Sequence, residues 1–307
     1  MNQPKPNLII IAGPNGSGKS TLTRRTLRDS NLPVIDPDAI AREINPTSPE
    51  SAAIRAGREA INQINNYLDN NQSFIAETTL SGNNYLKVMD KAKKKGFEVS
   101  LIYIGVDNVN TNISRVQLRA RRGGHNVPPD DIRRRYERSM NNLAKALEIA
   151  NSSTIYDNSA QAEPKEILLL ENNQIVQSSN NIPQWVTQAV PQELFDSYSN
   201  RLNIALQIYP TINQVRDILN DRLIEVEPNV QKLEGSKYNV IINNNTQKIT
   251  LLAKDDRNNL FIYNQRDNQM IFVSSINNTD ISTWLAISEQ LNNTNKQRTS
   301  TDKDIEI

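Results

Sequence analysis

Short apolar runs alternate with amphipathic stretches over the first part of the chain. The runs at 8–12, 33–35, 73–79, 98–106 and 154–159 favour strands. The stretches between them carry apolar residues at helical spacing, which predicts helices. Strands that alternate with helices indicate an α/β fold, a parallel sheet with helices on both faces, in which ligands bind at the carboxyl ends of the strands. A hairpin of strands at 167–170 and 174–176 is expected to complete this unit.

From about residue 172 the chain becomes rich in Asn and Gln, and 178–181 reads as a linker. Helices are predicted at 192–208, 211–223 and near 281–291. Between the second and third of these, four runs separated by polar turns predict an antiparallel meander: 238–242, 248–253, 260–263 and 270–273. We therefore expect a first domain over 1–180, a small α+β module over 181–290 with no chemistry-bearing motif, and a disordered tail over 291–307.

A glycine-rich segment follows the first predicted strand and opens a predicted helix. It matches the pattern G-x-x-x-x-G-K-[ST] and consists of Gly13, Pro14, Asn15, Gly16, Ser17, Gly18, Lys19 and Ser20, with Thr21 next. Glycines allow successive backbone N–H groups to face a phosphate, and the helix N-terminus adds donors and a positive dipole end. Lys19 is expected to reach the β- and γ-phosphates, and the Ser20 hydroxyl to ligate Mg2+. This segment predicts a nucleotide site.

Two carboxylates follow predicted strands and would reach the same sheet edge. Asp38 comes just after a short strand and could accept a proton from a substrate hydroxyl. Its alternative is a role in capping the next helix, which we assign to Asp36. Glu77 ends an apolar strand, where it could bind a substrate hydroxyl or Mg2+, or be an ordinary surface acid.

The stretch from 108 to 147 is the most arginine-dense of the chain and reads as two helices, the second capped by Asp130 or Asp131. Phosphoryl transfer needs one or two cations on the moving group, and a lid that closes over the nucleotide could supply them. The candidates are Arg115, Arg122 and Arg135, although most arginines here are expected to be solvated. His125, the only histidine, is either a substrate-binding residue or a surface loop residue.

Composition narrows the function classes. The net charge of +1 gives no argument for binding nucleic acid or a membrane, and the absence of cysteine excludes disulfides and thiolate metal sites. No apolar run approaches the length of a membrane span, and the polar N-terminus does not resemble a signal peptide. We expect a cytoplasmic protein.

Four segments together resemble the zeta-toxin family of P-loop kinases, in its bacterial "predicted ABC-type ATPase or kinase" branch, over residues 6–180. They are Gly13 to Thr21, Ile35 to Asp38, Phe74 to Gly82 and Arg119 to Pro128, and Tyr156 to Ser159 also has a counterpart in that branch. The resemblance implies a strand order of 2-3-1-4-5 and a kinase that uses ATP and Mg2+. Zeta toxins phosphorylate the 3′-hydroxyl of the amino-sugar in UDP-N-acetylglucosamine.

The same resemblance implies roles for single residues. Lys19 and Ser20 would hold phosphate and Mg2+, Asp38 would be the general base, and Glu77 with Thr78 would hold substrate. Arg115 and Arg122 would be lid arginines, and Asn158 would lie near the adenine. Two features differ from the typical toxin: the Gly-Gly-His loop at Gly123, Gly124 and His125, and the C-terminal module.

Our hypothesis is therefore an ATP-dependent small-molecule kinase acting on a nucleotide sugar. The alternatives are a kinase for another hydroxyl, and an ATP-binding regulatory module that transfers no phosphate. ATP and the nucleotide sugar are the expected partners. The sequence carries no signal for an antitoxin or another protein partner.

Overall fold

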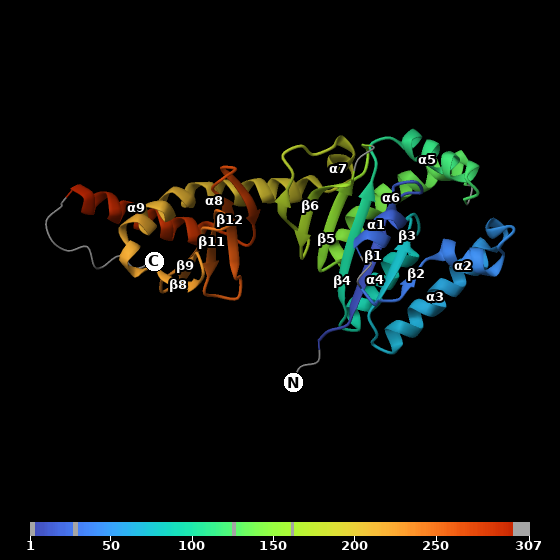
Figure 1. Cartoon of the computed structure of the whole chain (residues 1–307), viewed down its shortest axis with the longest axis horizontal. Helices are drawn as coiled ribbons and strands as arrows, with labels where there is room; N and C mark the ends of the chain where they lie inside the picture. Colours follow the sequence, from blue (N-terminus) through green and yellow to red (C-terminus); the bar gives the residue numbers. More distant parts are fainter. Residues whose placement is uncertain (1–3, 27–29, 125–126, 161–162, 297–307) are drawn as a thin grey trace. The chain divides into compact units, whose positions relative to one another are not determined.

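Strands and helices alternate through the first part of the chain in the computed structural model, which describes residues 4–26, 30–124, 127–160 and 163–296 (Figure 1). The strands of the first sheet are β1 (Asn7–Ala12), β2 (Val34–Ile35), β3 (Phe74–Thr78), β4 (Glu98–Gly105), β5 (Ser152–Asp157), β6 (Lys165–Glu171) and β7 (Gln174–Ser178). The helices are α1 (Lys19–Thr26), α2 (Pro37–Ile44), the 3-10 turn η1 (Pro49–Ala52), α3 (Ala53–Asp69), α4 (Asn84–Lys94), α5 (Val109–Arg121), α6 (Pro129–Ile149) and α7 (Gln184–Ala189).

The first sheet has the order β2-β3-β1-β4-β5-β6-β7. Its first five strands are parallel and β6 runs antiparallel to β5, so the α/β fold and the strand order implied by the family resemblance are confirmed. β1 and β3 end together, since Ile11 pairs with Glu77 and Ala12 with Thr78. The carboxyl ends of the central strands therefore share one edge, where the glycine loop begins.

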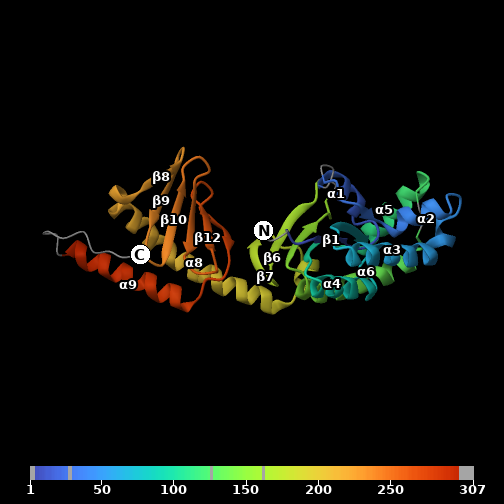
Figure 2. The same ribbon diagram turned by 90° about the horizontal axis from the view of Figure 1, so that it is seen from below.

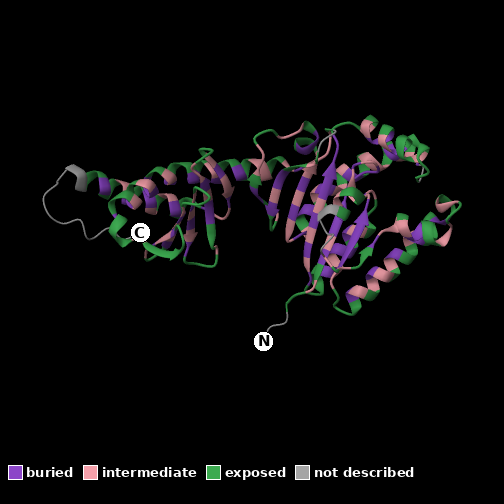
Figure 3. Cartoon of the chain, viewed as in Figure 1, coloured by how far each residue is buried: buried purple, intermediate pink, exposed green. Residues whose placement is uncertain are grey.

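Both faces of this sheet are covered by helices. Leu22 of α1 packs with Ile11, Ile75 and Ile104 on one face. Tyr103, which points to the opposite face by strand alternation, bonds Ser139 of α6 through its hydroxyl at 2.9 Å. Most residues of the central strands β1, β3 and β4 are buried, drawn in purple in Figure 3, with intermediate ones in pink. Burial on both faces explains why these strands read as continuous apolar runs.

The first compact unit comprises residues 1–173 and 178–192, so it extends beyond the boundary expected at residue 180. The reason is α7, whose Trp185 is buried and donates from its indole nitrogen to Asp157 Oδ1 at 2.7 Å. Gly105 lies against the same indole ring. The sequence analysis did not predict this six-residue helix or its packing.

The second unit, residues 174–177 and 193–307, begins with a helix longer than expected. The predicted helices at 192–208 and 211–223 are one continuous helix, α8 (Gln192–Ile218), followed by the 3-10 turn η2 (Asn220–Arg222). Pro210 lies inside α8 at an exposed position, and buried residues flank it on both sides, among them Ile208 and Ile212. Their packing stabilises the helix despite the missing N–H of the proline.

The predicted antiparallel meander is present and larger than expected. It contains β10 (Tyr238–Asn243), β11 (Lys248–Ala253), β12 (Asn259–Asn264) and β13 (Gln269–Val273), and the sequence missed β8 (Ile224–Glu227) and β9 (Val230–Glu234). The final helix α9 (Asn278–Lys296) includes residues 291–296, which we expected in a disordered tail. Residues 297–307 lie outside the described residues.

Two helices cover one face of this second sheet (Figure 2). Tyr209 of α8 stacks on Tyr263, and Trp284 of α9 packs on Tyr238. The strand register places Tyr263 and Tyr238 on the same face. In neither unit is any described helix both long and apolar enough to span a membrane.

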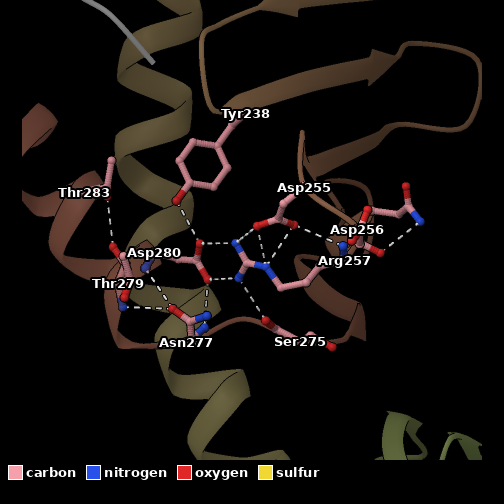
Figure 4. A network of polar contacts seen from close by, with 10 residues as sticks. Tyr238, Asp255, Asp256, Arg257, Ser275, Asn277, Thr279, Asp280 and Thr283 are labelled. Atoms are coloured by element: carbon pink, nitrogen blue, oxygen red, sulfur yellow. Dashed lines mark hydrogen bonds and ion pairs between the residues drawn. The ribbon is translucent and has the colours of Figure 1, made fainter.

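A polar network ties α9 to this sheet (Figure 4). Asp280, only 1% exposed, accepts hydrogen bonds from the Tyr238 hydroxyl at 2.8 Å and from both terminal nitrogens of Arg257 at 2.6 and 3.0 Å. Arg257 also donates to Asp255 and to the Ser275 carbonyl. The buried carboxylate is thus fully partnered.

Candidate active site

A cleft of about 550 Å³ opens where the carboxyl ends of β1 and β3 meet the glycine loop. Most of the residues singled out from the sequence line it. These are Asn15, Gly16, Gly18, Lys19, Ser20, Thr21, Asp38, Glu77, Thr78, Arg115, Arg135 and Asn158. The parallel sheet brings these groups together, because its strands deliver them to one edge.

Lys19 is the first residue of α1 and lies back along the glycine loop. Its Nζ donates to the carbonyls of Gly13 at 2.7 Å and Pro14 at 3.0 Å. Burial lowers the pKa of this ammonium group, and the carboxylates of Glu77 and Asp38 act in the opposite direction. Lys19 is thus a desolvated cation held against the glycine loop.

Glu77 is held by two hydroxyls of α1. Ser20 Oγ donates to its Oε2 at 3.0 Å and Thr23 Oγ1 to its Oε1 at 2.6 Å, and the residue is 5% exposed. A carboxylate bonded to the phosphate-loop serine lies where nucleotide kinases hold Mg2+ between that hydroxyl and an acidic residue. Mg2+ keeps several waters and needs only one or two carboxylates, so Ser20 and Glu77 fit it. The described residues contain no cluster of three or more His, Cys, Asp or Glu that could hold another metal ion.

Asp36 and Asp38 take different positions at the start of α2. Asp36 caps the helix, as expected, because its Oδ1 accepts from the Asp38 amide at 2.9 Å. Asp38 lies in the first turn and lines the cleft. Burial raises the pKa of Asp36, and the carboxylates of Glu77 and Asp38 raise it further. Asp36, Asp38 and Glu77 therefore all line the cleft.

Arginines enter the cleft from α5 and α6. Arg115 and Arg119 come from α5, and Arg135 from α6. Arg122 caps the C-terminus of α5 and does not line the cleft, since it lies about 10 Å farther along the helix axis than Arg115 at 1.5 Å per residue. It lines a neighbouring surface hollow with Gly123 and Gly124, and Arg115 and Arg119 line both this hollow and the cleft. His125 lies outside the described residues.

Asp130 and Asp131 were expected to cap α6. They lie in its first turn instead, and the cap position is Pro128 without a side-chain hydrogen bond. The two acids still suit the positive end of the helix dipole.

The sequence analysis missed Tyr85 and Arg119, which line the cleft, and Thr23, a buried residue that bonds Glu77. Helical spacing could have found two of them, because Thr23 lies one turn after Ser20 and Arg119 one turn after Arg115. Tyr85, at the start of α4, carried no such signal. Its buried hydroxyl has no hydrogen-bond partner among the described residues.

Known proteins resemble the first unit. Residues 1–164, more than half of the 307-residue chain, match the sequence model of the family described as zeta toxin. Over 128 residues the chain is 44% identical to an uncharacterised protein of Haemophilus influenzae, a match that covers 42% of this chain and 91% of that protein.

Solved structures are similar to this chain at low sequence identity. An AvrRxo1-ORF1:-ORF2 complex superposes with a TM-score of 0.50 at 13% identity, over 61% of this chain and 65% of that chain. The PezAT toxin–antitoxin system of Streptococcus pneumoniae gives a TM-score of 0.40 at 17% identity, over 66% of this chain and 88% of that one. The present chain therefore spans slightly less than two thirds of the AvrRxo1 chain that it matches.

Proposed function

The chain belongs to the zeta toxin family, and on that premise we propose that its first unit transfers the γ-phosphoryl group of ATP to a hydroxyl of a nucleotide sugar such as UDP-N-acetylglucosamine. The family and the P-loop kinase fold support an ATP-using kinase. One observation carries the proposal furthest. A phosphate loop, a cleft-lining carboxylate that bonds the loop serine, and a second carboxylate at the start of α2 line the same cleft.

The donor half of the site consists of the glycine loop with Lys19, Ser20 and Glu77. The loop N–H groups and Lys19 would bind the β- and γ-phosphates, and Ser20 with Glu77 would hold Mg2+. Mg2+ supplies neutralisation of phosphate charge when bound. We thus place Glu77 on the metal side of the reaction rather than on the sugar.

The acceptor half is centred on Asp38. The acceptor oxygen attacks the γ-phosphorus, the bond from that phosphorus to the bridging oxygen breaks, and ADP leaves. Asp38 accepts the proton that the hydroxyl loses. Arg115, Arg119 and Arg135 also line the cleft and would stabilise the negative charge of the transferred group. Arg122 has no role in this proposal.

Asp38→Asn is the direct test. We expect the wild-type chain with Mg2+ and ATP to phosphorylate a member of a nucleotide-sugar panel. The variant should lower kcat by about 10²–10⁴-fold because general-base catalysis is lost, with the Kd for ATP within about twofold. Steady-state transfer assays and calorimetric ATP titrations measure the two quantities.

Asp90→Asn is the matched control. It removes the same charge from an exposed position of α4, where Asp90 pairs with Lys94. It should leave both quantities unchanged. A wild-type chain that binds ATP and phosphorylates no acceptor would contradict the proposal and favour a regulatory ATP-binding module.

A further inference from the structure

Two asparagines from outside the glycine motif hold two carbonyl oxygens of the phosphate loop. Asn112, in α5, donates from Nδ2 to the Asn15 carbonyl at 2.7 Å. Asn158, just after β5, donates from Nδ2 to the Ser17 carbonyl at 2.7 Å. Asn158 is itself fixed to the sheet, because its backbone N–H donates to the Gly105 carbonyl at 2.9 Å. The loop is therefore clamped from two different elements.

These bonds orient the loop amides. In a trans peptide the C=O and the following N–H point in opposite directions. A bond that holds the Asn15 carbonyl on the Asn112 side turns the Gly16 N–H away from Asn112. Likewise, the bond from Asn158 to the Ser17 carbonyl turns the Gly18 N–H away from Asn158. Both glycines line the cleft in which phosphate would lie.

The two glycines are also the places where the asparagine residues touch the loop. A Cβ on Gly16 would lie 2.6 Å from the Asn112 backbone oxygen, and a Cβ on Gly18 would lie 2.4 Å from Asn158 Nδ2. Both glycines have positive φ, 77° and 103°. Each clamp thus needs a glycine opposite it, and the motif supplies one in both places.

The surroundings of Asn112 indicate that its side-chain amide is needed for the Nδ2 donor. The residue is fully buried, and its Oδ1 has no hydrogen-bond partner among the described residues. An unsatisfied buried oxygen costs stability, and such groups call for a functional reason. The bond that the same amide makes to the phosphate loop is that reason.

We infer that Asn112 and Asn158 are positioning residues that hold the phosphate loop in its nucleotide-binding conformation before ATP arrives. The apparent affinity for a ligand falls with the fraction of the protein that is competent to bind it, so a loop released from either clamp binds ATP more weakly. Asn158 acts through the loop in this assignment, and not on the adenine. The inference rests on the ATP-binding part of the proposed function and is independent of the acceptor.

The test compares Asn112→Ala and Asn158→Ala with the wild-type full chain. Calorimetric titration with Mg-ATP should show a Kd raised about tenfold in each variant, the effect of losing one hydrogen bond and leaving a loop carbonyl unheld. The Kd for UDP-N-acetylglucosamine should stay within about twofold. Asn112→Ala also leaves the buried Asn15 carbonyl without its donor, so the Tm of its ATP-free form should fall as well.

Asn151→Ala is the matched control. Asn151 Oδ1 accepts from the Val99 amide at 2.9 Å, a side-chain bond to the same sheet but at the opposite ends of β4 and β5. This variant should lower the Tm and leave the Kd for ATP unchanged. Variants of Asn112 and Asn158 that lose Tm but bind ATP as the wild type does would overturn the inference, because the asparagines would then be structural only.

The proposed function fails separately, if the wild-type chain binds Mg-ATP but transfers no phosphate. That result would leave the clamp standing. A wild-type chain that binds no Mg-ATP would overturn both.

Discussion

Glu77 depends on a hydroxyl that no phosphate-loop motif contains. The motif supplies Ser20, but the shorter of the two bonds to the carboxylate comes from Thr23, one helical turn later. Both residues are on α1, so the helix fixes the carboxylate from two points. If Glu77 helps to hold Mg2+, the orientation of its oxygens matters for the transfer step.

Thr23→Val tests this dependence. Valine keeps the shape of threonine but cannot donate, so we expect kcat to fall about 10- to 100-fold, in line with the roughly 1.5–3 kcal/mol of a hydrogen bond to a charged group. Thr23→Ser retains the hydroxyl and should restore most of the activity. Transfer rates at saturating ATP and acceptor provide the measurement, and wild-type kcat in the valine variant would refute it.

Asp36 makes the stability of the protein depend on pH. Its pKa is raised in the folded chain by burial and by two neighbouring carboxylates, so the folded state holds this proton more tightly than the unfolded state does. Ionisation of Asp36 therefore costs stability as the pH rises above the ordinary carboxyl pKa.

Asp36→Asn should raise the free energy of unfolding at pH 7, because asparagine can still cap α2 but carries no charge. The gain should shrink as the pH is lowered below the ordinary carboxyl pKa of 3.8, where both states of the wild type become protonated. Denaturant unfolding at several pH values measures it. A gain that persists unchanged at low pH would show that charge is not its cause.

At the scale of elements, α8 shows how packing overrides a local signal. Proline disfavours a helix interior because it lacks the N–H and its ring meets the preceding turn. Pro210 nevertheless lies inside one helix, whose flanking turns bury Ile208 and Ile212. Tyr209, beside the proline, stacks on Tyr263 at a ring-centroid distance of 3.6 Å.

Pro210→Ala should therefore stabilise the second unit, by about 1–3 kcal/mol, since alanine restores the hydrogen bond at an exposed position. Gln207→Ala, also exposed on α8, is the control and should change stability by less than about 0.5 kcal/mol. Thermal unfolding gives both values. A destabilised alanine variant would mean that the proline geometry itself is needed.

At the scale of the whole molecule, the chain divides its tasks. Every residue that lines the nucleotide cleft belongs to the first unit. The second unit has its own core and its own ion pair between the buried Asp280 and the partly exposed Arg257. The second unit therefore contributes no residue to the lining of the cleft.

Arg257→Met should lower the stability of the second unit by about 3–5 kcal/mol, because it leaves the buried Asp280 carboxylate without its cation. The Kd for ATP should stay within about twofold of the wild-type value. Thermal unfolding and calorimetric ATP titration measure the two effects. A large loss of ATP affinity would show that the second unit supports the cleft.

The sequence alone determined what depends on neighbouring residues. The glycine loop, the strand before it, the Asp36 cap and the order of strands and helices follow from short-range patterns, and each is present in the structure. Parallel strands then bring Lys19, Asp38 and Glu77 to one edge, so even part of the cleft was predictable from residues far apart.

Only the tertiary structure decided the contacts that hold those groups in place. Asn112 reaches the phosphate loop across 97 residues of sequence, Thr23 reaches Glu77 across 54, and Trp185 reaches Asp157 across 28. No periodicity or motif encodes such pairs, because each depends on how whole elements pack. Packing of the buried residues on either side of Pro210 likewise made α8 one helix. The position of Arg122 at the end of α5 left it outside the cleft. Both outcomes depend on the folded chain and not on a local pattern.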